Sequence, residues 1–184
     1  MRTVVIGSGS WGTALAQVLQ DNHQEVMVYG VAENEVNDIN ENHKNSKYFA
    51  DVELNPELKA TTDISCVKGA DIVLLAVPTI AIDPICHQIN ELLDRKTIII
   101  NVSKGFHPET NERMSQVIRR CIDEDKLSSV VSLIGPSHAE EVVIRLLTTI
   151  DAISLKNDDA VTVQNLFSNQ YLRIYTGNDE IGSE

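Results

Sequence analysis

Three glycines lie close together near the start of the chain, between a short apolar run and an amphipathic segment. Residues 7–12 read Gly-Ser-Gly-Ser-Trp-Gly, a GxGxxG pattern that follows the β-branched run from Thr3 to Ile6. In such a turn Gly7 permits the tight bend, Gly9 lets a pyrophosphate approach the backbone, and Gly12 allows a helix to pack closely on the strand. The pattern predicts a dinucleotide-binding unit that uses the free N–H groups of the helix start. A glycine-rich turn without a ligand is the structural alternative.

The rest of the chain alternates strand-like runs with amphipathic stretches. Apolar residues recur with the helical period in residues 11–19, 82–93 and 114–122. The strand candidates are Thr3 to Ile6, Glu25 to Tyr29, Asp71 to Val77, Thr97 to Val102, Ser129 to Ile134, Ile150 to Leu155 and, near the end, Ile174 to Thr176. This alternation predicts an α/β fold, a Rossmann-type doubly wound and mostly parallel sheet with helices on both faces.

Two segments do not share this pattern. Residues 40–55 are polar and lack periodicity, which predicts one long loop. The chain ends at Gly182-Ser183-Glu184 without a visible capping element, which suggests a truncated chain. No linker rich in Pro, Gly or Ser interrupts the sequence, so we expect residues 1–184 to form a single domain.

Composition disfavours several classes of protein. Lys and Arg number 15 against 27 Asp and Glu, and a net charge of −12 repels nucleic acid and anionic membranes. The three cysteines include no CxxC pair and the five histidines no HxxxH pair, so neither a disulfide framework nor a metal site is predicted. No apolar run approaches the ~20 residues of a membrane span, and no signal peptide opens the chain. We therefore expect a cytoplasmic protein without a membrane span or a nucleic-acid partner.

The end of the second strand candidate bears on the choice of cofactor. The chain there reads Tyr29-Gly30-Val31-Ala32-Glu33. An acid at this place binds the adenosine ribose of NAD, whereas a cation meets the 2′-phosphate of NADP. No Arg or Lys follows the strand, and Glu33 lies slightly late for a ribose ligand. The segment therefore leans weakly to NAD, and Glu33 is equally well explained as a first-turn helix acid.

Polar residues also follow three later strand candidates, at the sheet edge where ligands bind in open α/β folds. Pro78-Thr79 follows the first, Ser103-Lys104-Gly105 the second, and residues 135–141 the third. Lys104 is a candidate to pair with a phosphate or polarise a carbonyl, and a solvated lysine is its alternative. Ser137 and Glu140 have the spacing of a capping box, which is compatible with anion binding at the same helix start.

Four stretches together resemble one known family. They are GSGSWGTALA at 7–16, AVPT at 76–79, VSKG at 102–105 and GPSHAEEV at 135–142. Their order and spacing resemble the N-terminal domain of bacterial NAD(P)-dependent glycerol-3-phosphate dehydrogenase, over essentially the whole chain. The resemblance implies a cytoplasmic oxidoreductase that uses NAD or NADP. It would transfer hydride between NAD(P)H and dihydroxyacetone phosphate, giving sn-glycerol 3-phosphate for phospholipid synthesis.

The resemblance also implies roles for individual residues. Besides Gly7, Gly9 and Gly12, the cofactor contacts carried over are Ser10, Trp11, Tyr48, Lys104 and Ala139, and the substrate contacts are Lys104, Gly135 and Ser137. For Tyr48, packing of a loop aromatic is the alternative. The family usually has Arg or His where this chain has Val31 and Ala32, which disfavours a strong NADP preference.

The family's catalytic lysine follows a segment that Gly182-Ser183-Glu184 resembles, so it would lie beyond Glu184. No catalytic residue is then expected in this chain, and the family's helical substrate domain would be absent. The chain alone is expected to bind cofactor with little or no turnover. Family enzymes commonly form homodimers, largely through the domain that is missing here.

Two other functions remain open at the level of the sequence. A related β-hydroxyacid or sugar-acid dehydrogenase would share the same first half. A non-catalytic dinucleotide-binding module that senses redox state through a partner would need only the cofactor site.

Overall fold

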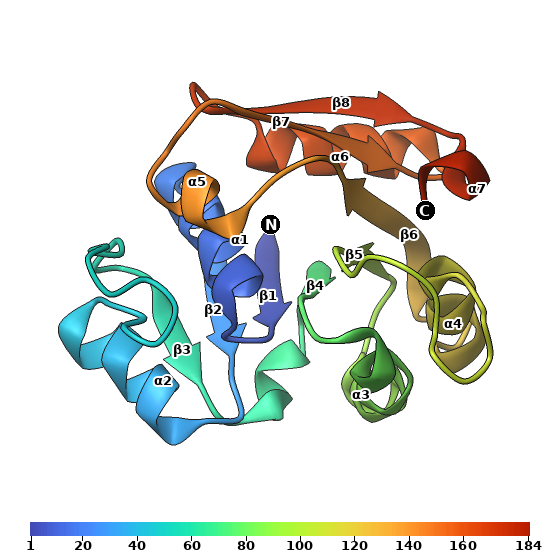
Figure 1. The fold of residues 1–184 in the computed structure, drawn as a ribbon. Helices are drawn as coiled ribbons and strands as arrows, with labels where there is room; N and C mark the ends of the chain where they lie inside the picture. Colours follow the sequence, from blue (N-terminus) through green and yellow to red (C-terminus); the bar gives the residue numbers. More distant parts are fainter.

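The computed structural model describes all residues from Met1 to Glu184, and eight of its segments are strands. They are β1 (Arg2–Ile6), β2 (Glu25–Tyr29), β3 (Lys59–Thr61), β4 (Ile72–Leu75), β5 (Thr97–Asn101), β6 (Leu127–Ile134), β7 (Thr148–Ile153) and β8 (Leu172–Gly177). They form one sheet in the order β3-β2-β1-β4-β5-β6-β7-β8 (Figure 1). Only the β6–β7 pair is antiparallel.

The order of the first six strands is that of the Rossmann fold, so the predicted fold is confirmed. Every predicted strand is present, with ends shifted by up to two residues. Strand β3 was not predicted, because its three residues are too short to show a periodic pattern.

Seven α-helices accompany the sheet. They are α1 (Ser10–Asp21), α2 (Glu33–Asn37), α3 (Thr79–Leu92), α4 (Met114–Cys121), α5 (Ala139–Val143), α6 (Asn157–Phe167) and α7 (Glu180–Ser183), with a π-helical turn at Asp38–Asn42 and a 3-10 turn at Ile64–Val67. The three helices predicted from periodicity correspond to α1, α3 and α4. The short helices α2, α5 and α7 could not show a periodic stripe.

The helices cover both faces of the sheet. Helices α1, α5 and α6 pack with Val5 of β1 on one face, and α3 and α4 pack with Val4 and Ile6 on the other (Figure 1). Because successive strand residues point to opposite faces, both layers are filled from the same strands. A sheet buried on both faces accounts for the unbroken apolar runs of the central strands.

Helix α1 is fixed in place by residues far away in the sequence. All of its residues from Gly12 to Gln20 are buried. At its end, Asp21 accepts hydrogen bonds from Nε of Arg145 at 2.8 Å and from the hydroxyl of Tyr171 at 2.7 Å. The side chain of Asn22 donates to the carbonyl of Leu166 at 2.7 Å. The GxGxxG segment at residues 7–12, which we call the glycine turn, leads into α1. Its position therefore depends on the second half of the chain.

The segment predicted as a loop, residues 40–55, starts within the π-helical turn and then continues without helix or strand. It is nevertheless anchored, since Asn45, Phe49 and Leu54 are buried. The side chain of Asn40 exchanges two 2.9 Å hydrogen bonds with the backbone of Ala60 in β3. Residues 40–55 are thus packed against the rest of the domain, and we call this segment the anchored loop.

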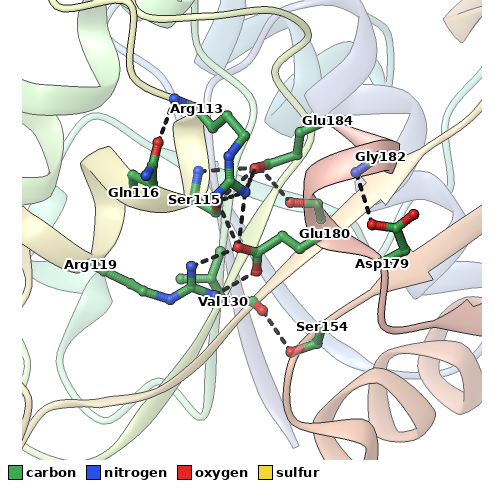
Figure 2. Close-up of polar contacts among 11 residues, drawn as sticks. Arg113, Ser115, Gln116, Arg119, Val130, Ser154, Asp179, Glu180, Gly182 and Glu184 are labelled. Carbon is green, nitrogen blue, oxygen red and sulfur yellow. Dashed lines mark hydrogen bonds and ion pairs between the residues drawn. The ribbon is translucent and has the colours of Figure 1, made fainter.

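The last residues of the chain form α7, a short helix that was not predicted from the sequence. Asp179 accepts a 2.9 Å hydrogen bond from the backbone of Gly182 and so caps α7. Glu180 and Glu184 turn inward to meet Arg113, Ser115 and Arg119, a group that we call the Arg–Glu cluster (Figure 2). Helix α7 could not be predicted because four residues show no helical period and its partners come from α4 and the residue before it.

No helix has both the length and the apolar character that crossing a lipid bilayer requires.

Candidate functional site

A cavity of about 590 Å³ opens at the carboxyl ends of β1 and β4. Its walls are Gly7–Trp11, the Val31-Ala32 segment after β2, Lys47 and Tyr48 of the anchored loop, and Ala76–Pro78 after β4. The chain leaves β1 toward β2 on one side, while β4 lies on the other, so the cavity is at the switch point of the sheet. Ligands of open α/β folds bind at this place.

The three glycines of the turn have distinct structural roles. Gly7 has a φ of +118°, and a Cβ atom there would overlap the carbonyl oxygen of Ala76. A Cβ atom on Gly12 would overlap the carbonyl oxygen of Gly7, so this glycine lets α1 pack against the turn. A Cβ atom on Gly9 would meet nothing within 4 Å, because Gly9 borders open space. These observations agree with the bend, the packing and the access predicted from the spacing.

The start of α1 faces this cavity with free backbone donors. Gly9 is the N-cap residue, and no side chain caps the first turn. Ser10 and Trp11, both predicted cofactor contacts, line the cavity at this turn. Uncapped N–H groups and the partial positive charge of a helix N-terminus favour an anion such as pyrophosphate.

Asn45 holds the glycine turn from the side of the anchored loop, and sequence reasoning did not find it. Its Nδ2 atom donates to the carbonyl of Ser8 and to Oγ1 of Thr13, each at 2.8 Å. The side chain is buried, and the contacts span more than 30 residues of sequence. A single asparagine in a polar segment offers no sequence signal for this role.

Replacing Asn45 with alanine is expected to lower the free energy of unfolding by about 2 kcal/mol, because Ser8 and Thr13 lose a buried donor. Urea unfolding followed by circular dichroism measures this change. Asn42→Ala is the matched control, since Asn42 is exposed and bonds only to Asp38 at 3.0 Å. The control should change stability by less than about 0.5 kcal/mol. Equal effects of the two substitutions would contradict the anchoring role.

Glu35 lines the cavity, whereas the sequence analysis had weighed Glu33 as the acid that would bind a ribose. The Glu35 carboxylate accepts a 2.6 Å hydrogen bond from Oγ of Ser8 and a 2.7 Å bond from Nζ of Lys47. Burial alone would raise the pKa of Glu35, but the bonds from Lys47 and Ser8 outweigh it and hold the pKa below its ordinary value. Glu33 is exposed in the first turn of α2 and does not line the cavity. Of the two interpretations of Glu33, the first-turn helix acid is therefore confirmed.

Lys47 and Tyr48 reach the cavity together from the anchored loop. The Lys47 ammonium lies 5.0 Å from the centre of the Tyr48 ring, a cation–π arrangement. Tyr48 is 38% exposed and lines the cavity, so it is not part of the core. The sequence predicted Tyr48 as a site residue, whereas Lys47 carried no separate signal.

Lys104 and Gly135 meet in a smaller cavity of about 220 Å³ beyond the ends of β5 and β6. The ammonium of Lys104 donates to the carbonyl of Gly135 at 3.4 Å, a long contact to a neutral partner. Ser183 and Glu184 complete the lining of this cavity. The two predicted substrate contacts Lys104 and Gly135 are thus brought together.

Ser137 and Ala139, also predicted site residues, are buried and do not line either cavity. The backbone N–H of Ser137 donates to the carbonyl of Gly135 at 3.0 Å. The predicted capping box of Ser137 and Glu140 is wrong, since α5 has His138 as its N-cap and no side chain caps it. The helix starts one residue later than that spacing requires.

Two other features lie away from these cavities. A polar cavity of about 520 Å³, lined by Lys96, Arg119 and Lys156 among others, is at the amino ends of β5 and β6, opposite to the edge where this fold binds ligands.

Asp83, His87 and Cys121 place atoms that could ligate a metal within 4.8 Å of one another between α3 and α4. Arg120 donates to Asp83 at 2.8 Å, and burial raises the pKa of the Cys121 thiol to about 11. We therefore describe this group as part of the contact between two helices.

Comparisons with known proteins agree with the geometry. Residues 2–161 match a family model described as NAD-dependent glycerol-3-phosphate dehydrogenase N-terminus. Glycerol-3-phosphate dehydrogenase [NAD(P)+] of Listeria monocytogenes serotype 4b is 47% identical over 100% of this chain and 54% of its own length. The enzyme of that name from Streptococcus uberis is 43% identical over the same shares. The chain therefore spans about half the length of the curated relatives it matches.

The fold is also found among solved structures. The crystal structure of glycerol-3-phosphate dehydrogenase from Coxiella burnetii has a TM-score of 0.90 to this chain at 26% sequence identity. The match covers 98% of this chain and 55% of that one.

Proposed function

Because this chain belongs to the NAD-dependent glycerol-3-phosphate dehydrogenase family and matches its N-terminal part, we propose that it is the cofactor-binding domain of such an enzyme. The full-length enzyme transfers hydride between NADH or NADPH and dihydroxyacetone phosphate, giving sn-glycerol 3-phosphate for phospholipid synthesis. Residues 1–184 are the NAD(P)-binding Rossmann domain. The helical substrate domain, with the lysine that protonates the carbonyl oxygen, belongs to the remaining half of the enzyme.

The observation that carries this proposal is the glycine turn at the start of α1. The uncapped helix N-terminus at Gly9 borders open space, at the mouth of a cavity of about 590 Å³. Both the volume and the mostly apolar lining are typical of small-molecule and cofactor sites. The residues present therefore fit a dinucleotide, whose nicotinamide ring supplies the hydride when it is bound.

In this proposal the chain's own residues bind and orient the reactants. The backbone at Gly9, Ser10 and Trp11 holds the pyrophosphate, and Tyr48 contacts the cofactor from the anchored loop. Lys104 pairs with the substrate phosphate and contacts the cofactor, with Gly135, Ser137 and Ala139 shaping the backbone beside it. The long contact of Lys104 to a neutral carbonyl leaves its charge available for an anion.

The experiment that tests this proposal is a fluorescence titration with NADH and NADPH. Trp11 is the only tryptophan and lines the cavity, so saturable quenching of its emission reports cofactor binding. We expect dihydroxyacetone phosphate to tighten NADH binding about fivefold or more, a coupling of the size common between two binding sites. Lys104→Met should abolish the tightening, and Lys96→Met, an exposed lysine at the opposite sheet edge, should not.

Other outcomes of the titration separate the alternatives. Tightening of NADH binding by 3-oxo acids in place of dihydroxyacetone phosphate would favour a β-hydroxyacid dehydrogenase. Binding of NADH with no response to either substrate would favour a redox-sensing module. Absence of quenching by both cofactors would contradict the proposed domain.

A further inference from the structure

The part of the cavity near the end of β2 contains one acidic and one basic residue, Glu35 and Lys47. We propose that Glu35 makes this site select NADH over NADPH, because its carboxylate accepts a hydrogen bond from the adenosine ribose and repels a 2′-phosphate. Lys47 moderates the selection by pairing with that carboxylate. The inference rests on the proposed function, since it assumes that the cavity binds a nicotinamide dinucleotide.

The position of Glu35 follows from its bond to the glycine turn. A pyrophosphate at the start of α1 directs the adenosine ribose toward the end of β2. The wall there includes Val31 and Ala32, whose side chains have no polar atom to bond to a ribose hydroxyl. Glu35 projects from α2 to the same wall, and its 2.6 Å bond from Ser8 places the carboxylate beside the second residue of the turn.

The carboxylate has the charge and the free acceptor capacity that this role needs. Its side chain is only 7% exposed, and each oxygen accepts one hydrogen bond, from Ser8 or from Lys47. A carboxylate offers about four lone-pair sites, so acceptors remain for a ribose hydroxyl. A ligand that brings a hydroxyl gains a bond there, and one that brings a phosphate places like charges together.

Lys47 is the only cation that lines this cavity. It is already paired with Glu35 at 2.7 Å, so the pair has a net charge near zero. A 2′-phosphate adds a charge of about −2. With Glu35 ionised, one lysine faces two anionic groups and cannot neutralise both. Without the Glu35 charge, the same lysine would be free to pair with the phosphate.

The test compares dissociation constants for NADH and NADPH, measured by Trp11 quenching, in three proteins. Glu35→Gln keeps the side-chain size and the acceptor oxygen but removes the charge. We expect the ratio of the NADPH constant to the NADH constant to fall at least about tenfold, as relief of a like-charge contact implies. Glu33→Gln is the matched control, with the same charge change on the exposed face of α2, and should leave the ratio unchanged. An unchanged ratio in Glu35→Gln, or equal changes in both variants, would overturn the inference.

A second variant, which keeps the Glu35 side chain and removes its partner, should shift the ratio in the opposite direction. Lys47→Gln leaves Glu35 without its counter-charge and should weaken NADPH binding more than NADH binding, by about threefold or more. A variant in which NADPH binding improves would overturn the inference. Failure of the parent protein to bind either cofactor would instead count against the proposed function, and equal binding of both cofactors by the parent against the inference alone.

Discussion

Alanine in place of Gly12 is expected to destabilise the domain by about 3 kcal/mol or more and to abolish NADH binding at the same time. The added methyl group overlaps the carbonyl oxygen of Gly7, and no flexible side chain can move away to make room. Helix α1 must then shift relative to the glycine turn, which also displaces the amides that we propose to receive the pyrophosphate. Urea unfolding and the fluorescence titration measure the two effects separately.

Gly9→Ala is the matched control, because it adds the same methyl group three residues earlier. No atom lies within 4 Å of that methyl group, and Gly9 has an extended backbone that alanine readily adopts. Stability should therefore change by less than about 0.5 kcal/mol, while NADH binding weakens at least about tenfold where the methyl group meets the pyrophosphate. A strongly destabilised Gly9→Ala protein, or a Gly12→Ala protein of normal stability, would show that the roles of the glycines are assigned wrongly.

Loss of Glu180 is the second large effect that we expect. Its oxygens accept bonds from the two terminal nitrogens of Arg119 at 2.7 and 2.6 Å, and Arg113 contributes a third contact at 3.2 Å (Figure 2). Glu180→Ala leaves two arginines without this partner, which for a buried ion pair costs about 3 kcal/mol. Since the domain has 184 residues, the melting temperature should fall by roughly 10 °C. Glu109→Ala, which removes an exposed glutamate, is the control and should have little effect.

The pH dependence of the same effect has a definite sign. Burial alone would raise the pKa of Glu180, but Arg119, Ser115 and Arg113 outweigh it and hold the pKa below its ordinary value. Glu180 therefore contributes its full stability above the unfolded pKa of about 4.3 and loses it as the pH falls through the folded pKa. The difference in unfolding free energy between the parent and Glu180→Ala should accordingly shrink on acidification below pH ~4. A difference that grows toward low pH would contradict this assignment.

The fold and the glycine turn could be predicted because their signals are local. Residues 4–6 and 72–75 are buried on both faces, so each appears as an unbroken apolar run, and the roles of Gly7, Gly9 and Gly12 follow from their spacing. Lys104 and Gly135, which contact each other, each follow a strand, so both could be placed at the same edge of the sheet.

The remaining site residues could not be predicted because their signals are tertiary. Asn45, which holds the glycine turn, and Lys47, which lines the cavity, both come from a polar loop. The path of this loop is set by contacts to β3 and α1 and not by any periodicity. Glu35 was overlooked in favour of Glu33, because only the start of α2 decides which acid of that turn points inward. The Ser137 capping box failed for the same reason, as a shift of one residue in the start of α5 changes the capping residue.

The anchoring of α1 by Arg145, Leu166 and Tyr171 has a consequence for synthesis of the protein on the ribosome. A nascent chain that has exposed only β1, α1 and β2 already contains the glycine turn, but it lacks the partners of Asp21 and Asn22. Domains tend to fold as units once their sequence has emerged. The glycine turn is therefore expected to reach its final position late, after the residues that hold α1 in place have left the exit tunnel.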